Sequence, residues 1–145
     1  MKNIYRKTFP RGTSASAVKR EAALQKVAAK YKLSPKVLET DGKTYIDMEH
    51  LDEMSISDVY GDDIEEIPPK ILSAMWSALY TLYHVCGIEY VDVWPRNFIE
   101  KGGRVWIIDF GDARELTYKD NEEHNDYLQE ILEAGTITHW NQDFE

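Results

Sequence analysis

The chain has 145 residues, 43% of them hydrophobic, which is enough for one ordinary core but not for two full domains. We therefore expect a single domain over 1–145. The formal net charge of −9 makes nucleic acid an unexpected partner, because a phosphate backbone needs a basic footprint. No run approaches the roughly 18 to 20 apolar residues of a membrane span, and the polar start differs from a secretory signal. These features predict a soluble, intracellular (cytoplasmic) protein that contacts no membrane.

The charge is distributed unevenly along the chain. Residues 1–36 carry ten Lys or Arg and a single acid, Glu21, so this stretch has a charge of +9 and the remaining 109 residues carry −18. Two interpretations stay open: a basic face for an anionic ligand or partner, or solvated helix faces that balance an acidic body.

The first quarter of the chain predicts a strand followed by a helix. Segment 4–9 alternates apolar and polar residues, as a strand does. Ser16 is the expected cap of a helix that runs to about Lys32 and ends at Ser34-Pro35. The expected apolar stripe of this helix consists of Val18, Ala22, Val27 and Tyr31.

The next segment predicts a β-hairpin and then a linker. Strands are expected over 36–39 and 43–48, joined by Asp41-Gly42, a dipeptide typical of hairpin turns. From 47 to 66 the composition becomes acidic, which predicts a linker with one short helix at about 57–60. This linker divides the chain into two halves.

The second half begins with the most regular helix pattern in the sequence. Pro68-Pro69 precede it, and Gly87 is its expected end. Its expected buried face consists of Ile71, Leu72, Met75, Leu79, Leu82 and Val85. Strands over 97–100 and 104–108 predict a second hairpin. A last helix is expected over 124–133, followed by a polar tail.

Three oxygen-bearing side chains flank this second hairpin. Asp92 precedes it, Asn97 is expected to open its first strand, and Asp109 follows its second strand. A hairpin brings the two ends of its strands to one edge, so the three side chains should lie close together. Carboxylate and amide oxygens are the ligands that Mg²⁺ accepts beside phosphate oxygens.

These residues resemble the protein-kinase-like superfamily. Asp92 and Asn97 have the spacing of the catalytic loop H-R-D-x-x-x-x-N, and Asp109-Phe110-Gly111 matches D-F-G. The resemblance implies an α+β, truncated two-lobed protein-kinase-like fold. Residues 1–51 would form the N-lobe and hinge, a small sheet with one helix, and 52–145 would form a reduced, mainly helical C-lobe.

The resemblance also implies nucleotide contacts in the first half. Segment 45–51 is similar to the fifth strand and hinge of a kinase, with Met48 as gatekeeper and residues Glu49 to Leu51 beside the adenine. Arg20-Glu21-Ala22 resembles the R-E-A of small atypical kinases, so Glu21 would hold a phosphate-binding lysine. Lys7 is the expected lysine and Lys2 the reserve, while a solvated Lys7 on an edge strand is the alternative.

The sequence departs from the kinase pattern at several positions. Too few residues precede Lys7 for a glycine-rich loop, and no Ala-Pro-Glu follows Asp109-Phe110-Gly111. Tyr90 and Val91 replace the His and Arg of the catalytic loop, and Trp94 stands where serine/threonine kinases keep a Lys. Segment 123–128 is similar to the helix that follows the metal-binding Asp in compact atypical kinases and antibiotic phosphotransferases.

The implied function is a phosphotransferase that depends on ATP and Mg²⁺, most directly a minimal serine/threonine-type protein kinase. Asp92 would orient or deprotonate the acceptor hydroxyl, Asn97 and Asp109 would ligate Mg²⁺, and Lys7 would bind phosphate. Arg96 is expected in a surface salt bridge with nearby acids, and contact with the phosphate or the acceptor is the alternative. The alternatives are a weak or inactive pseudokinase that binds a protein, and a small-molecule phosphotransferase. The expected partners are nucleotide and a protein substrate or binding partner; the oligomeric state is left open.

Overall fold

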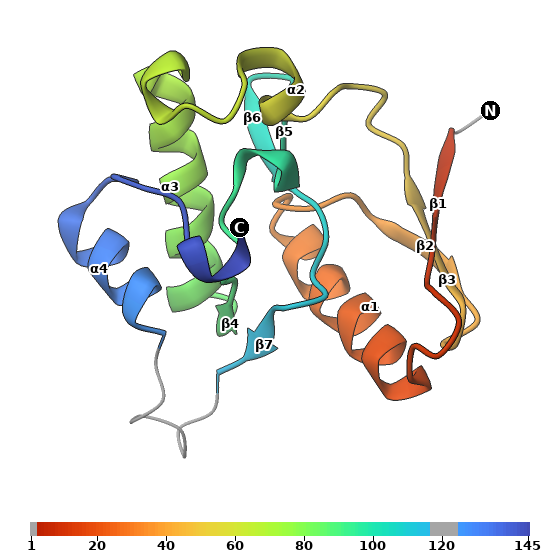
Figure 1. Cartoon of the computed structure of the whole chain (residues 1–145). Coiled ribbons are helices and arrows are strands. Elements are labelled where there is room, and N and C mark those ends of the chain that lie inside the picture. Colours follow the sequence, from red (N-terminus) through yellow and green to blue (C-terminus); the bar gives the residue numbers. More distant parts are fainter. Residues whose placement is uncertain (1–2, 117–124) are drawn as a thin grey trace.

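The computed structural model describes residues 3–116 and 125–145 as a mixed α+β protein (Figure 1), which confirms the predicted class. The strands are β1 (Ile4–Thr8), β2 (Val37–Thr40), β3 (Tyr45–Glu49), β4 (Ile88–Glu89), β5 (Phe98–Lys101), β6 (Arg104–Ile107) and β7 (Arg114–Glu115). The helices are α1 (Ala15–Lys30), α2 (Ile56–Tyr60), α3 (Pro69–His84) and α4 (Asp126–Ala134). In Figure 1, α1 and its sheet lie on one side, α3 and α4 on the other, and β5 and β6 between them.

The N-terminal sheet is antiparallel and has the strand order β1-β3-β2. Side chains alternate between the faces of a strand. Tyr5 and Lys7 of β1 consequently share one face, and both line a pocket. Arg6 lies between them, and its Nε is 2.7 Å from the carboxylate of Asp47, its pairing partner on β3. This alternation directs Lys7 toward the functional site.

Helix α1 begins earlier than the sequence predicts, and Val18 and Ala22 of its predicted stripe are buried. Its cap is Ser14, not Ser16, because Ser14 has extended backbone angles and its hydroxyl accepts a hydrogen bond from Ala17 N. Tyr31 lies beyond the helix and is 46% exposed, so it does not belong to the stripe. The buried positions of the helix are Val18, Glu21, Ala22, Leu24, Gln25 and Ala28. Glu21 and Gln25 are polar, so an apolar pattern does not select them.

The hairpin of β2 and β3 is confirmed, and its turn is held by one side chain. The Asp41 carboxylate accepts hydrogen bonds from the backbone N–H groups of Lys43, Thr44 and Tyr45. Gly42 has φ 70°, a left-handed conformation that glycine adopts without strain. The expected linker starts too early, because Asp47 is a central residue of β3. The short helix predicted within the linker is α2.

Helix α3 confirms the longest helix prediction. Ile71, Met75, Leu79 and Leu82 are buried as expected, whereas Val85 is 56% exposed because the helix ends at His84. Two clusters of buried hydrophobic side chains form the core. The smaller packs α1 on the N-terminal sheet and contains Val18, Ala22, Ile46 and Met48. The larger is centred on α3 and includes Leu24 and Ala28 of α1. Helix α1 therefore contributes to both clusters.

The second hairpin is formed by β5 and β6, as predicted, but Asn97 does not open its first strand. Asn97 ends a 3₁₀ turn, Pro95–Asn97, and β5 starts one residue later. Helix α4 confirms the last predicted helix from Asp126 onward, while its expected first residue, His124, lies outside the described residues.

The segment after α4 is packed rather than a free polar tail. Ile137 and Trp140 are 3% and 5% exposed, and the Trp140 indole donates a hydrogen bond to Asp62 O at 2.6 Å. In the described parts of the chain, no helix has the length and apolar character that crossing a membrane requires.

Candidate functional site

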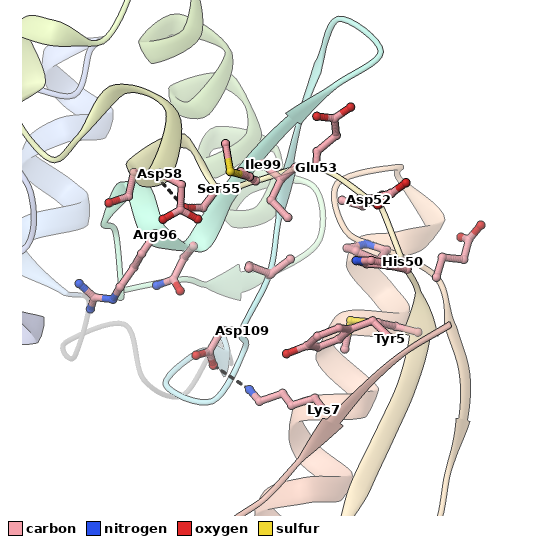
Figure 2. Close-up of a pocket in the computed structure, with 18 residues that line it drawn as sticks. Tyr5, Lys7, His50, Asp52, Glu53, Ser55, Asp58, Arg96, Ile99 and Asp109 are labelled. Carbon is pink, nitrogen blue, oxygen red and sulfur yellow. Dashed lines mark hydrogen bonds and ion pairs between the residues drawn. The ribbon is translucent and has the colours of Figure 1, made fainter. Parts of the chain in front are cut away.

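A pocket of about 610 Å³ lies between the N-terminal sheet and the second hairpin. Its lining includes Tyr5 and Lys7 from β1, residues 48–55 at the end of β3 and after it, and Asn97, Ile108 and Asp109 around the hairpin. Figure 2 shows Lys7 extending from one side of this pocket toward Asp109 on the other. The pocket thus brings together segments from both halves of the chain, as the motif pattern predicted.

Lys7 lies between two carboxylates. Its Nζ is 2.6 Å from Glu21 Oε2 and 3.1 Å from Asp109 Oδ1. The Glu21 side chain is 4% exposed and that of Lys7 is 25% exposed, whereas the Asp109 side chain is 47% exposed and therefore accessible to a ligand. Lys7 does lie on an edge strand, but its ammonium group is paired with two carboxylates rather than solvated alone. The reserve candidate, Lys2, lies outside the described residues.

The environment of this pair keeps Lys7 charged. Burial alone lowers the pKa of the Lys7 amine, but the hydrogen bond and charge of Glu21, together with Asp109, outweigh burial and raise that pKa above its ordinary value. Burial raises the pKa of the Glu21 carboxyl, and the Lys7 ammonium opposes this rise. An ionised Glu21 therefore depends on Lys7 as its partner.

Asp109 is held in a strained backbone conformation. Its φ is 64°, in the left-handed region, where a residue with a Cβ loses roughly 1–3 kcal/mol. The Tyr90 hydroxyl lies 2.6 Å from Ile108 O and 2.8 Å from Asp109 O, and it donates its proton between these two carbonyl oxygens. Gly111 N donates to Asp109 Oδ1 at 3.1 Å. These contacts fix the carboxylate in the pocket.

Position 111 leaves little room for a side chain. A Cβ at that position would lie 3.2 Å from Asp109 Oδ1 and 3.3 Å from Glu21 Oε1, which is closer than side-chain packing usually allows. The absence of a side chain lets both carboxylates approach the turn that follows Asp109.

Asn97 lies on the same pocket wall as Asp109. The backbone N–H of Ile108 donates to Asn97 O at 2.9 Å, so Asn97 is paired directly with the residue before Asp109. The Asn97 side chain is buried, and its Nδ2 donates to Asp92 O at 2.9 Å. Because this bond occupies the amide nitrogen, the amide oxygen remains available to a ligand in the pocket.

Asp92 lies beside the pocket rather than in its lining. Arg96 Nη2 is 2.9 Å from Asp92 Oδ1 and also donates to Phe144 O at 2.8 Å, so the salt bridge predicted for Arg96 is present. Burial raises the pKa of the Asp92 carboxyl, and repulsion from Asp109 and Asp112 adds to it, while Asn97 and Arg96 act in the opposite direction. A carboxylate with a raised pKa is a better proton acceptor than an ordinary aspartate.

The residues expected beside an adenine also line the pocket. Met48 is 6% exposed, and Glu49 and Leu51 follow it along the wall. Leu51 O accepts a hydrogen bond from Lys101 Nζ. Among the contacts of the described residues, the Leu51 N–H has no acceptor, so this backbone donor is available to a bound base.

Some residues that shape the site were not identified from the sequence. Tyr90 was noted only as a departure from the motif, although its hydroxyl clamps the backbone at Asp109. Asn141 is 2% exposed, and its Nδ2 donates to Val91 O, next to Asp92. No spacing rule links a residue near the end of the chain to position 91, so only the packed structure reveals this contact.

No protein-family model matches the chain, and a search of curated proteins also finds no match. Within the described residues, no three His, Cys, Asp or Glu side chains gather as a metal-binding group. The candidate ligands Asn97 and Asp109 are an amide and one carboxylate, a set that Mg²⁺ completes with phosphate and water oxygens.

Proposed function

We propose that the chain is a minimal phosphotransferase that uses ATP and Mg²⁺, has a truncated protein-kinase-like fold, and transfers phosphate to a protein hydroxyl. One observation carries the proposal: Lys7 Nζ lies within hydrogen-bond distance of both Glu21 and Asp109, residues separated by most of the chain. The motif resemblance assigns a role to each of these three residues. The Lys7 contact provides the geometry that those roles require.

The residues present suit a magnesium–nucleotide complex. A pocket of about 610 Å³ is within the usual range for small-molecule and cofactor sites. It offers an ammonium group for phosphates, one amide and one carboxylate oxygen for a cation, and a backbone donor at Leu51 for a base. Met48 supplies an apolar wall. The two core clusters, joined by α1, support the proposed two-lobed arrangement.

The residues act mainly by positioning and by charge. Bound Mg²⁺–ATP supplies the phosphoryl group and neutralises the charge that develops during its transfer. Asp92 accepts the proton of the acceptor hydroxyl as the oxygen of that hydroxyl forms its bond to phosphorus, and a nucleoside diphosphate leaves. Asn97 and Asp109 would hold the Mg²⁺ ion. Lys7, kept in place by Glu21, binds the phosphates that are not transferred.

Transfer from γ-labelled ATP to general protein substrates, or to the chain itself, tests this proposal. We expect Asp109→Ala to lower the transfer rate by about 100-fold or more, because a charged group at the phosphates is lost. Asp112→Ala is the matched control, since it removes an exposed acid from the same turn and should retain most of the activity. Equal transfer by wild type and Asp109→Ala would refute the proposal.

A second candidate function is a protein-binding module without catalysis. It is favoured by the Arg96–Asp92 ion pair, because Arg96 is also held by Phe144 O and neutralises the proposed base. Thermal unfolding with millimolar Mg²⁺–ATP separates the two candidates. A ligand at 100 times its Kd stabilises the folded state by about 2.7 kcal/mol, so an unchanged Tm would favour the module.

A further inference from the structure

A second cavity, of about 710 Å³, lies outside the proposed catalytic site. It is bordered by the end of α1, the turn that leads into β2, and β6. The turn is fixed to β6 by a hydrogen bond of 2.7 Å from Ile107 N to Leu33 O. Glu49 is the one residue that lines both pockets. We refer to this second space as the lysine cavity.

The lysine cavity is strongly basic in an acidic protein. Five cationic side chains line it, against the single carboxylate of Glu49: Lys26, Lys30, Lys32, Lys36 and Arg104. Within the described ranges, none of the five forms an ion pair with a carboxylate. This concentration of unpaired positive charge contrasts with the net charge of −9 for the whole chain.

Keeping these lysines together costs stability. Lys26 and Lys30 are one helical turn apart on α1, where like charges repel by a few tenths of a kcal/mol. Lys32 has φ 58°, at the end of a helix, where glycine or asparagine is the usual residue. A lysine in this left-handed conformation is disfavoured by roughly 1 kcal/mol or more. Both features place charge at the cavity where neutral residues would be more stable.

A buried hydroxyl without a hydrogen-bond partner lies beside the lysine cavity. Ser34 lines the lysine cavity and is 1% exposed. Its hydroxyl is the one buried side-chain polar atom without a hydrogen-bond partner in the described parts of the chain. Such an atom normally loses about 1–3 kcal/mol unless it finds a partner. Trp106, whose indole N–H is bonded to Lys101 O, adds a fixed aromatic wall.

We propose that the lysine cavity binds a small molecule that carries several phosphate groups, through the clustered lysines and the Ser34 hydroxyl. Ammonium groups from two segments of the chain suit phosphates that are spaced along one ligand. The volume lies within the range of small-molecule sites and is too small to enclose a macromolecule. The acidic remainder of the protein disfavours a long nucleic-acid backbone.

Calorimetric titration with inorganic tripolyphosphate at low salt tests the lysine cavity. A chelator in the buffer removes Mg²⁺, so that the proposed catalytic pocket does not bind a magnesium–phosphate complex. We expect Lys30→Ala/Lys36→Ala to weaken binding about tenfold or more, because two charge-assisted hydrogen bonds are lost. The matched control is Lys43→Ala/Lys70→Ala, which removes the same charge from exposed positions outside the cavity. The control should bind within about twofold of wild type.

Ser34→Ala provides a test that does not depend on net charge. Without ligand, its Tm should equal or exceed that of wild type, because the hydroxyl has no partner in the described residues to lose. Its affinity for tripolyphosphate should fall several-fold. Unchanged affinity would contradict the role of Ser34.

Three outcomes overturn the proposal as a whole: no binding to wild type, equal weakening by both double-lysine variants, or a phosphorylated peptide that binds far more tightly than the free anion.

Vesicles containing a polyphosphoinositide distinguish two sources of the same chemistry. Vesicle binding that Lys30→Ala/Lys36→Ala abolishes identifies a lipid headgroup, whereas binding of tripolyphosphate alone identifies a free metabolite. Both results support a polyphosphate site, and neither depends on whether the chain transfers phosphate.

Discussion

At the scale of single residues, the Lys7 ammonium group determines the charge state of the site. Glu21 is 3% exposed, and a carboxylate so deeply buried is stable in its ionised form only beside a cation. Asp109 shares the same ammonium group but remains half exposed. Lys7 thus links a structural carboxylate to one that is accessible to a ligand.

Lys7→Met should destabilise the protein by about 1–3 kcal/mol at pH 7, because it leaves Glu21 buried without its partner. The loss should shrink as the pH falls, since the pKa of Glu21 is raised by burial and the carboxyl can then take up a proton. Urea denaturation at pH 7 and pH 5 measures both effects. Lys43→Met, at an exposed position, is the control.

A double variant in the same denaturation experiment tests the coupling between Lys7 and Glu21. Lys7→Met/Glu21→Gln removes both charges, so it should be less destabilised than the sum of the two single variants, by about 0.5–3 kcal/mol. If the stability losses of the two single variants simply add up in the double variant, Lys7 and Glu21 are not energetically coupled, and the stabilising role of their ion pair is contradicted.

Arg96→Gln should shift the acidic limb of the kcat/KM profile to higher pH. Arg96 lowers the pKa of Asp92, which burial raises, so removing the arginine raises that pKa further. Asp92 must be ionised to accept a proton, so activity is lost at a higher pH as the solution is acidified. Arg20→Gln, an exposed arginine outside the site, is the control. A limb that stays in place, or moves to lower pH, argues against Asp92 as the base.

The sequence predicted the residues that motifs describe and missed those that packing selects. Lys7, Glu21 and Asp109 were chosen from strand alternation and motif resemblance, and the structure brings them into contact. No sequence motif marks the role of Tyr90. That role depends on a buried ring, which aligns the hydroxyl with two carbonyl groups 18 and 19 positions along the chain. The helix cap is Ser14 and not the predicted Ser16, because a cap is defined by its backbone angles, which the sequence does not show.

At the scale of elements, the segment after α4 holds the loop of residues 91–97 in place. Trp94 Nε1 donates to Asn141 O at 2.7 Å, and Asn141 Nδ2 donates to Val91 O at 2.9 Å, so two bonds tie the loop to this segment. Residues 136–145 were predicted to be a polar tail. Ile137 and Trp140 are buried, however, and Asn141 donates to a buried backbone carbonyl, a role that composition does not distinguish from solvation.

Asn141→Ala should destabilise the protein by about 1–3 kcal/mol, because Val91 O loses its buried donor. It should also increase hydrogen exchange over 91–97. Gln142→Ala is the neighbouring control, since its side chain is exposed and makes only a 3.4 Å contact. The control should change stability by less than about 0.5 kcal/mol. Equal effects of the two substitutions would show that the Asn141 side chain does not hold the loop in place.

At the scale of the whole molecule, α1 connects the two core clusters. Val18 and Ala22 pack on the N-terminal sheet, while Leu24 and Ala28 pack in the cluster around α3. The buried stripe of the helix also includes the polar residues Glu21 and Gln25. Apolar spacing predicted that the helix exists but not that it joins both clusters.

Leu24→Ala should destabilise the entire protein by about 2–5 kcal/mol, the usual range for truncating a buried leucine. Because α1 belongs to both clusters, unfolding should remain one transition, with tryptophan fluorescence and far-UV circular dichroism coinciding. Val59→Ala, at a residue that is 54% exposed, is the control and should change stability little. Separate fluorescence and dichroism transitions would show that the clusters unfold independently.

The central claim is that Asn97 and Asp109 ligate a cation in the pocket that Lys7 enters. Calorimetric titration with a nonhydrolysable ATP analogue, with and without Mg²⁺, tests it directly. We predict binding that Mg²⁺ strengthens in wild type and in Asp112→Asn, and loss of this Mg²⁺ effect in Asp109→Asn. Binding that is absent, or equally strong without Mg²⁺ in all three proteins, would contradict the claim.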